Sequence, residues 1–439
     1  MGATGFSIAQ FLASKGQAFH VFDTRSSSSM LEKFEESFPE SQTFFGDIDQ
    51  SLVLEAEEIY LSPGVSRNEE VISSAIAAGK SVVGDIDLFL REVECPVIGI
   101  TGSNGKSTVT TLVGMAAENA HVNVGVGGNI GTPALELLKR PAELYVLELS
   151  SFQLESTPKP HLDVACNLNV SADHMDRYED LNDYAAVKRG IYIGAKNAVY
   201  NFDDELTKPE TTLVASQTYA FGLGDLEESD LGAGAYRYST DNGWLTCGSE
   251  RLIHRDDIKV KGLHNVANAL ALFAIADAAK LKRDACVTTL KTFKGLSHRC
   301  EYITEKAGVT YINDSKATNV GAAVAAIEGL APEFGGIVLI AGGQGKGAEF
   351  DALGSCVEDH VRLVVLLGED KDKIASTLSD NVEKIFAESM DEAVEICKAK
   401  AKIGELVLLS PACASFDMFS SFGNRGDVFR NAVLKGGAL

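Results

Sequence analysis

The chain has 439 residues, which corresponds to about three domains of average size. Its composition is 45% hydrophobic and 23% charged, with 41 Gly and 10 Pro, which excludes the collagen-like, coiled-coil and disordered classes. Lys and Arg number 39 against 62 Asp and Glu, so the formal net charge is −23. This charge disfavours nucleic acid and anionic membranes as partners, and anionic substrates would need local cationic pockets.

The cysteines and the first residues bear on where the protein works. All eight cysteines stand singly, without a Cys-x-x-Cys pair, which is typical of reduced core residues. The first residues lack a basic segment followed by an apolar core, and Phe6 stands where a myristoylation signal needs Ser or Thr. Apolar runs such as 363–367 have the length of a strand and not of a membrane span. We therefore expect a cytoplasmic protein that is not inserted in a membrane.

The first region, residues 1–93, alternates short apolar runs with amphipathic stretches, which predicts βα units and a parallel sheet. The expected elements are a helix over 6–14 and strands over 18–22 and 57–61. Gly2 and Gly5 open the helix and Asp23 ends the next strand, as at the nucleotide end of a Rossmann-like unit. The apolar strand that should precede Gly2 is missing. Either the start is misassigned or trimmed, or the sheet lacks a central strand.

The second region, residues 94–297, opens with the strongest signal in the sequence. A buried strand over 97–100 runs into Thr-Gly-Ser-Asn-Gly-Lys-Ser-Thr at 101–108, and a helix follows to about residue 118. The spacing departs from the strict P-loop pattern, but the physics is the same. Small residues let backbone N–H groups approach phosphates, Lys106 reaches the terminal phosphates and Ser107 can bind Mg²⁺. A phosphate-binding loop is favoured over a plain strand–turn–helix.

Further polar residues follow strands of this region. Glu148 ends an apolar strand over 144–149, where a P-loop enzyme carries a second Mg²⁺ ligand, although a solvated acid is the plainer alternative. His174 follows an apolar run over 164–170 and would also lie at a strand's carboxyl end, although a lone His is usually structural. Residues 199–260 suggest a few antiparallel strands. Asn265 and Asn268 then lie on one face of an Ala-rich helix, for packing or for nucleotide contact.

The third region, residues 298–439, repeats the βα alternation. The expected strands lie at 310–313, 337–341, 362–367, 384–386 and 406–410. Polar or glycine-rich loops follow three of them, at 313–319, 342–347 and 410–417. Ligands gather at the carboxyl ends of parallel strands, and small residues opening a helix suit carboxylate capture. A glycine loop alone is a weak signal, because such turns often serve only tight connections.

Taken together, the motifs at 101–108, 173–177, 298–299, 313–319 and 410–415 resemble those of the Mur ligases of peptidoglycan synthesis. The resemblance covers the whole chain in the right order. It implies an α/β fold of three domains: a Rossmann-like N-terminal domain (1–93) for a UDP substrate, a P-loop ATPase-like central domain (94–297) for ATP, and a Rossmann-like C-terminal domain (298–439) for an amino acid.

The implied reaction is ATP-dependent amide formation. The two C-terminal motifs favour the family member that adds D-glutamate to UDP-N-acetylmuramoyl-L-alanine. The substrate carboxylate would take the γ-phosphoryl group of ATP, and the amine of D-glutamate would then displace phosphate from the acyl phosphate. The protein mainly positions groups and offsets negative charge. The implied cofactors are ATP and two Mg²⁺ ions, the partners are small molecules, and we expect a monomer.

The resemblance also implies site residues, position by position. Those with a role in catalysis or metal binding are Lys106, Ser107, Glu148, His174 and Lys188, with Lys188 carried as a carbamate. Those for ATP are Gly102, Ser103, Asn104, Gly105, Lys106, Ser107, Thr108, Asn268, Arg299 and Asp314. Those for the UDP substrate are Thr4, Asp23, Thr24, Arg25, Gly64 and Asn129. Those for D-glutamate are Thr318, Lys346, Ser415 and Phe422.

Three alternatives stay open at this point. A folylpolyglutamate synthase, or a Mur ligase for another amino acid, would share the fold, although the segment at 410–415 argues against it. A nicotinamide-dependent oxidoreductase would use Gly2, Gly5 and Asp23 but would leave Lys106 and Glu148 unexplained. A nucleotide-binding regulator would bind ATP without releasing phosphate in response to an amino acid.

Overall fold

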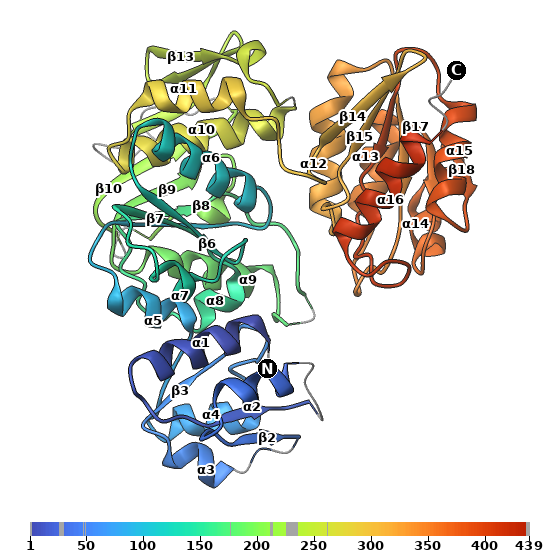
Figure 1. Ribbon diagram of the computed structural model, residues 1–439. Coiled ribbons are helices and arrows are strands. Elements are labelled where there is room, and N and C mark those ends of the chain that lie inside the picture. The colour runs from blue at the N-terminus through green and yellow to red at the C-terminus, as the bar shows by residue number, and fades with distance from the viewer. Residues whose placement is uncertain are drawn as a thin grey trace. The chain divides into compact units, whose positions relative to one another are not determined.

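The computed structural model describes residues 2–25, 30–46, 48, 50–175, 177–210, 214–224, 236–260 and 262–435 (Figure 1). All cysteines are free, as the sequence predicts. Among the described residues, none of the helices combines the length and the apolar character that a membrane span requires. Contact density divides the chain into two compact units: 1–169 with 184–252 and 270–289, and 170–183 with 253–269 and 290–439.

The first part of the chain carries short strands and helices in alternation, as predicted. In chain order these are α1 (Ala3–Ser14), β1 (Val21–Asp23), α2 (Leu31–Ser37), β2 (Thr43–Phe45), α3 (Gln50–Glu55), β3 (Glu58–Tyr60), α4 (Glu70–Ala77), β4 (Ser81–Val83) and α5 (Asp85–Glu92). The strands pair in parallel but as two separate two-stranded sheets, β1 with β2 and β3 with β4. In the described part before residue 93, no strand joins the two sheets.

The central part is built on a nine-stranded sheet in the order β13-β12-β11-β10-β9-β8-β5-β7-β6. Its strands are β5 (Val97–Thr101), β6 (Val124–Gly128), β7 (Leu144–Glu148), β8 (Val164–Asn167), β9 (Ala195–Asn201), β10 (Val214–Phe221), β11 (Tyr236–Asp241), β12 (Trp244–Cys247) and β13 (Glu250–His254). Strand β5 lies between β7 and β8 and is parallel to both. The loop after β5 therefore lies at the carboxyl edge of the sheet, as predicted.

Helices cover both faces of this sheet (Figure 1). They are α6 (Lys106–Asn119), α7 (Ala134–Leu137), α8 (Ser151–Glu155), α9 (Leu181–Arg189), α10 (Leu263–Ala278) and α11 (Arg283–Thr292), with short 3-10 turns at Gly190–Tyr192, Glu205–Thr207 and Arg255–Asp257. Apolar residues of α1 and α5, such as Ile8 and Phe89, pack in the same buried cluster as Leu147 of β7. The first part of the chain is therefore joined to the central sheet by a common core.

The antiparallel strands expected over 199–260 are only partly present. Strands β11 and β12 form the expected antiparallel hairpin, and its turn residues Asn242 and Gly243 both have positive φ angles, of 47° and 81°. Strands β9, β10 and β11, however, pair in parallel and extend the central sheet. The expectation failed there because alternating polarity shows that a strand is half exposed but does not fix the direction of its partner.

The last part of the chain forms a six-stranded sheet in the order β14-β15-β19-β16-β17-β18. The strands are β14 (Glu301–Lys306), β15 (Val309–Asn313), β16 (Ile337–Ala341), β17 (Val361–Leu366), β18 (Glu383–Phe386) and β19 (Leu406–Leu409). The helices are α12 (Val320–Leu330), α13 (Asp351–His360), α14 (Lys371–Thr377), α15 (Met390–Lys400) and α16 (Phe422–Leu434), with a 3-10 turn at Ala331–Glu333.

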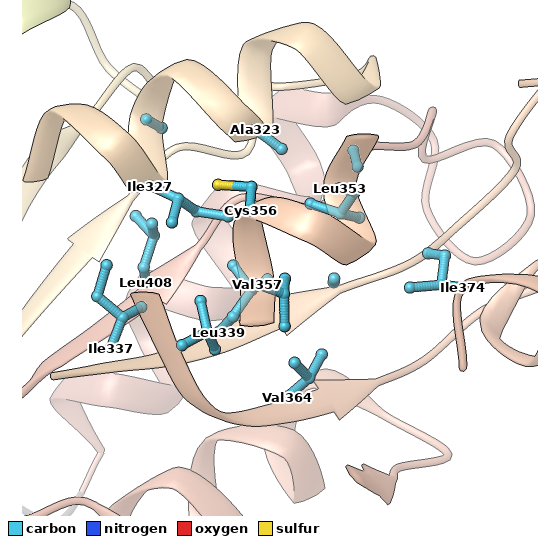
Figure 2. Packing of buried hydrophobic residues seen from close by; sticks show 14 of the residues in the cluster. Ala323, Ile327, Ile337, Leu339, Leu353, Cys356, Val357, Val364, Ile374 and Leu408 are labelled. Atoms are coloured by element: carbon cyan, nitrogen blue, oxygen red, sulfur yellow. The ribbon is translucent and has the colours of Figure 1, made fainter. Parts of the chain in front are cut away.

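Both faces of this sheet are buried. Leu339 and Leu408 pack with α12 and α13 in one cluster, which Figure 2 shows from close by. Their neighbours Ile340 and Leu409 point the other way, into a cluster with α15 and α16. Continuous apolar strands with helices on both sides are typical of a parallel sheet. The described architecture thus confirms the predicted α/β class.

Candidate active site

The loop after β5 has the backbone of a phosphate-binding loop. Two of its glycines adopt positive φ angles, Gly102 at 146° and Gly105 at 81°, which other residues rarely adopt. A Cβ atom on Gly102 would also lie 3.0 Å from the Cβ of Leu168. Helix α6 begins directly after Gly105, so its first N–H groups and its dipole face the loop. Anions bind favourably at such a position.

Lys106 is held at this loop. Its Nζ donates to the backbone oxygens of Gly102 at 2.7 Å and of Ser103 at 2.8 Å. The backbone N–H of Asn104 donates to the Asn169 side chain at 2.8 Å. The cation predicted to reach terminal phosphates therefore lies at the phosphate-binding loop.

Ser107 and Glu148 meet as predicted, although they are 41 residues apart. Ser107 Oγ lies 2.6 Å from Glu148 Oε2, and the glutamate is only 3% exposed. The side chain of Asn129 donates to Glu148 Oε1 at 2.8 Å, and the backbone N–H of Asn129 donates to the Glu148 carbonyl at 2.8 Å. Asn129, which was expected at the UDP substrate, therefore also orients the buried carboxylate.

Lys188 lies beside the same loop on helix α9. It is 1% exposed, its Nζ donates to the Gly102 carbonyl at 2.9 Å, and it lies 4.5 Å from the ring centre of Tyr184. The hydroxyl of Tyr184 is in turn 3.4 Å from Ser103 Oγ. Lys188 is therefore buried at this loop and is not a solvated helix lysine.

His174 belongs to the second compact unit. Its φ angle is 57°, and its backbone N–H donates to the carboxylate of Asp173. The other oxygen of Asp173 accepts from Asn319 at 3.1 Å. The segment of His174 is therefore tied to the motif at 313–319, which the sequence singles out independently. Asp176 of the His174 motif lies outside the described residues.

The expected ATP residues of this unit form two groups. Asp314 is 8% exposed and accepts from Ser410 Oγ at 2.9 Å and from the Cys300 N–H at 3.1 Å. Burial raises the pKa of Asp314 to about 7, and the charge of nearby Arg299 partly opposes the shift. Asn268 donates to Asn265 at 3.4 Å on helix α10, which confirms that the two amides share a face.

The four residues expected to bind D-glutamate are carried by loops that touch one another. The loop of Thr318 contacts the start of α16, because the hydroxyl of Ser315 donates to the Phe422 carbonyl at 2.8 Å. The loop of Lys346 pairs with the loop of Ser415, because Gln344 and Ala414 exchange backbone hydrogen bonds of 3.0 and 2.9 Å. These loops follow β15, β16 and β19, which are neighbours in the sheet.

The first part of the chain holds the remaining expected residues. Asp23 ends β1 and is 7% exposed, and Arg25 forms a two-point ion pair with it at 2.9 and 2.7 Å. Thr4 lies in the first turn of α1, and Gly64 lies in the turn after β3. Two of the residues expected to bind the UDP substrate, Asp23 and Arg25, therefore hold each other in place at the end of β1.

Two buried residues near these loops have no counterpart in the sequence predictions. Arg425 is 2% exposed and donates to backbone oxygens of Ser315, Cys413 and Ala414. Asp370, 7% exposed, accepts from the Gly345 N–H at 2.7 Å. The rule that polar residues after parallel strands face a ligand site would have found Asp370, because it follows β17. Nothing local marks Arg425 in its helix.

Three family models match the chain in order. "Mur ligase MurD-like, N-terminal domain" covers residues 1–84, "Mur ligase middle domain" covers 100–276 and "Mur ligase, glutamate ligase domain" covers 298–413.

Similar proteins cover nearly the whole chain. The chain is 49% identical to the UDP-N-acetylmuramoylalanine–D-glutamate ligase of Teredinibacter turnerae and 45% identical to that of Pseudomonas aeruginosa, each over 99% of this chain and 96% of the relative.

Solved structures show the same fold at low identity. A pseudomurein peptide ligase type C from Methanothermus fervidus has a TM-score of 0.62 at 19% identity, over 93% of this chain and 95% of that chain. A MurF ligase from Thermotoga maritima in complex with ADP has a TM-score of 0.59 at 17% identity, over 94% and 93%. With its sequence matched from the first region to the last, this chain belongs to the Mur ligase family.

Proposed function

We propose that this enzyme joins D-glutamate to UDP-N-acetylmuramoyl-L-alanine, with ATP converted to ADP and phosphate, in peptidoglycan precursor synthesis. The main support for the proposal is the P-loop, where Lys106 donates to the loop carbonyls and Ser107 contacts the buried carboxylate of Glu148. The full-length relatives named D-glutamate ligases support the choice of amino acid. The match of the first region to a Mur ligase domain argues against the oxidoreductase alternative.

Phosphoryl transfer to the substrate carboxylate needs compensation of negative charge and in-line positioning. Lys106 would leave its loop carbonyls for the β- and γ-phosphates, and the first N–H groups of α6 would hold the same phosphates. The substrate carboxylate then forms a bond to the γ-phosphorus while the bond to the β-phosphate oxygen breaks. Gly102 to Thr108 would form the wall of this phosphate site.

The donor set at this loop fits Mg²⁺. Ser107 and Glu148 present a hydroxyl and a carboxylate oxygen 2.6 Å apart, and Mg²⁺ prefers oxygen ligands. No group of three His, Cys, Asp or Glu side chains suited to a metal occurs among the described residues. A few protein oxygens suffice, because Mg²⁺ in such sites keeps waters and substrate phosphates as ligands. A bound Mg²⁺ would neutralise phosphate charge, and His174 would serve a second ion.

Lys188 would act as a carbamate. An ammonium repels Mg²⁺, whereas a neutral amine that adds CO₂ and releases a proton becomes an oxygen donor like a carboxylate. Lys188 is 1% exposed and its Nζ lies at the loop where the phosphates would bind. The carbonyl of Gly102, which accepts from Nζ, would fix the position of the end of the Lys188 side chain.

The remaining residues would bind substrates. Asn268, Arg299 and Asp314 would complete the ATP site, with the Asp314 carboxylate on the ribose. Thr318, Lys346, Ser415 and Phe422 would bind D-glutamate, and the amine of the amino acid would attack the acyl phosphate so that phosphate leaves through a tetrahedral intermediate.

The UDP substrate would bind to the first part of the chain. Thr4, Asp23, Thr24, Arg25 and Gly64 would surround the uridine diphosphate, and Asn129 would lie near the muramoyl end. We further propose domains at 1–93, 94–297 and 298–439, and a monomer that acts in the cytoplasm.

Release of phosphate from ATP tests the proposal. The enzyme is supplied with UDP-N-acetylmuramoyl-L-alanine and Mg²⁺, and D-glutamate is compared with L-glutamate, L-lysine and no amino acid. Release that depends on D-glutamate is expected. Phosphate release with another amino acid would support a ligase but refute D-glutamate as its substrate. ATP binding without phosphate release would favour the nucleotide-binding regulator instead.

A further inference from the structure

The loop that carries Lys346 is held by backbone contacts from two sides. On one side, Gln344 exchanges two hydrogen bonds with Ala414, next to Ser415. On the other side stands Asp370, which follows β17. Its backbone N–H donates to the Gly343 carbonyl at 3.0 Å, and its Oδ2 accepts from the Gly345 N–H at 2.7 Å. Asp370 thus holds the residues on both sides of Gln344.

The contact between Asp370 and Gly345 depends on close approach. A Cβ atom on Gly345 would lie 2.8 Å from the Phe350 ring and 3.1 Å from Asp370 Oδ2. The carboxylate is 7% exposed, so water competes little for the Gly345 N–H. A hydrogen bond to a charged group is roughly twice as strong as a neutral one.

Lys346 needs such support, because its backbone is in the left-handed region. Its φ angle is 51°, a conformation that is unfavourable for a residue with a Cβ atom. Such a conformation persists where the surroundings enforce it. The residue before Lys346 is Gly345, whose N–H is bound by Asp370 and whose carbonyl accepts from Ala348 at 3.0 Å. These two contacts set the direction in which the chain enters Lys346.

The charge of Asp370 is compensated within its own helix. Lys373 Nζ lies 2.5 Å from Asp370 Oδ1, and this ion pair, with the Gly345 N–H, holds the pKa of Asp370 below its usual range. The carboxylate therefore stays ionised at neutral pH as an acceptor. Because Lys373 neutralises it, it adds little repulsion toward an anionic amino acid at Lys346.

We propose that Asp370 is a positioning residue for the incoming amino acid: through Gly343 and Gly345 it fixes the backbone that presents the Lys346 ammonium to the side-chain carboxylate of D-glutamate. This inference rests on the proposed function of Lys346. Asp370 itself touches no substrate. Its loss should therefore weaken D-glutamate binding and leave ATP binding unchanged.

The test compares KM values for D-glutamate and for ATP. Asp370→Ala removes the acceptor of the Gly345 N–H. We expect the KM for D-glutamate to rise about tenfold, which corresponds to the loss of one charge-assisted hydrogen bond. The KM for ATP should stay within about twofold of its value in the unmodified enzyme. Asp370→Asn keeps an acceptor oxygen for the Gly345 N–H and should restore the KM to within about threefold of the unmodified enzyme. Asp372→Ala, an exposed acid in the same helix, is the matched control and should change neither value.

A double variant separates positioning from general damage. If Asp370 acts through Lys346, then Asp370→Ala combined with Lys346→Ala should be no worse than Lys346→Ala alone. Multiplied effects, or equal increases in both KM values, would overturn the inference. If Asp370→Ala does not fold, Asp370→Ser, which removes the carboxylate but keeps a small polar side chain, takes its place with the same expectations. An unmodified enzyme without D-glutamate-dependent phosphate release would refute the proposed function instead.

Discussion

Replacing Glu148 by Gln should lower the activity of the enzyme and leave its stability nearly unchanged. The carboxylate is 3% exposed and lies between Ser107 Oγ at 2.6 Å and Asn129 Nδ2 at 2.8 Å. Glutamine has the same shape. Its oxygen can still accept from Asn129, and its amino group can donate to the Ser107 hydroxyl, which can rotate to accept. No buried polar atom loses its partner, so the melting temperature should stay close to that of the unmodified enzyme.

The loss of charge should act on Mg²⁺ and on turnover. Two unit charges about 4 Å apart attract each other by about 4 kcal/mol at an effective dielectric constant near 20, and a divalent ion doubles this. Much of that energy is offset, because the carboxylate must lose its water to bind Mg²⁺ and because the amide oxygen of Gln in the variant can still bind the ion. We expect a net loss of about 3 kcal/mol, which is about a 100-fold loss in kcat or in Mg²⁺ affinity.

The assay is phosphate release at saturating substrates over a Mg²⁺ titration, together with thermal unfolding. Glu143→Gln makes the same chemical change just before β7, at an exposed position, and serves as the matched control. It should leave both the Mg²⁺ dependence and the rate unchanged. If Glu148→Gln keeps more than half of the activity with an unshifted Mg²⁺ dependence, the metal assignment at this loop is wrong.

Three further changes test other parts of the account. Lys106→Ala should abolish turnover, because it removes the cation of the phosphate loop, and near-normal phosphate release would refute the ATP site. Lys188→Ala should lose activity that added short carboxylates partly restore in the same assay, and failure of every carboxylate would argue against the carbamate. Burial raises the pKa of Asp85 from 3.8 to about 6, so its native form binds a proton more tightly than its unfolded form, and stability should fall as pH rises from about 4 to 6. The measurement is the melting temperature between about pH 4 and 6, and its decline should be smaller in Asp85→Asn. A pH profile identical to that of the unmodified enzyme would show that Asp85 does not cause the decline.

The P-loop was the most predictable part of the site. A buried strand, two glycines, a lysine and a helix lie next to one another in the chain, so local sequence determines how Lys106 lies at the phosphate loop. Glu148 was also predictable, because the carboxyl ends of parallel strands meet at one edge of the sheet. Strand position alone was enough to bring it to Ser107.

Residues whose role depends on contacts between distant segments were harder to predict. Lys188 has the local sequence of a solvated helix residue, and only the fold of α9 against the P-loop buries it. The link from Asn129 to Glu148 and the buried guanidinium of Arg425 depend on tertiary packing in the same way. The direction of β10 and β11 was missed because successive side chains point to opposite faces along any strand, whatever the direction of its partner.

The fate of one oxygen atom tests the central claim most directly. The alanine carboxylate of UDP-N-acetylmuramoyl-L-alanine is labelled with ¹⁸O, and the released phosphate is analysed by mass spectrometry with and without D-glutamate. If the carboxylate takes the γ-phosphoryl group and the amine then displaces phosphate, each phosphate released with D-glutamate carries one ¹⁸O atom, and one amide forms for each phosphate. Phosphate without ¹⁸O, or release that does not depend on D-glutamate, would contradict the account.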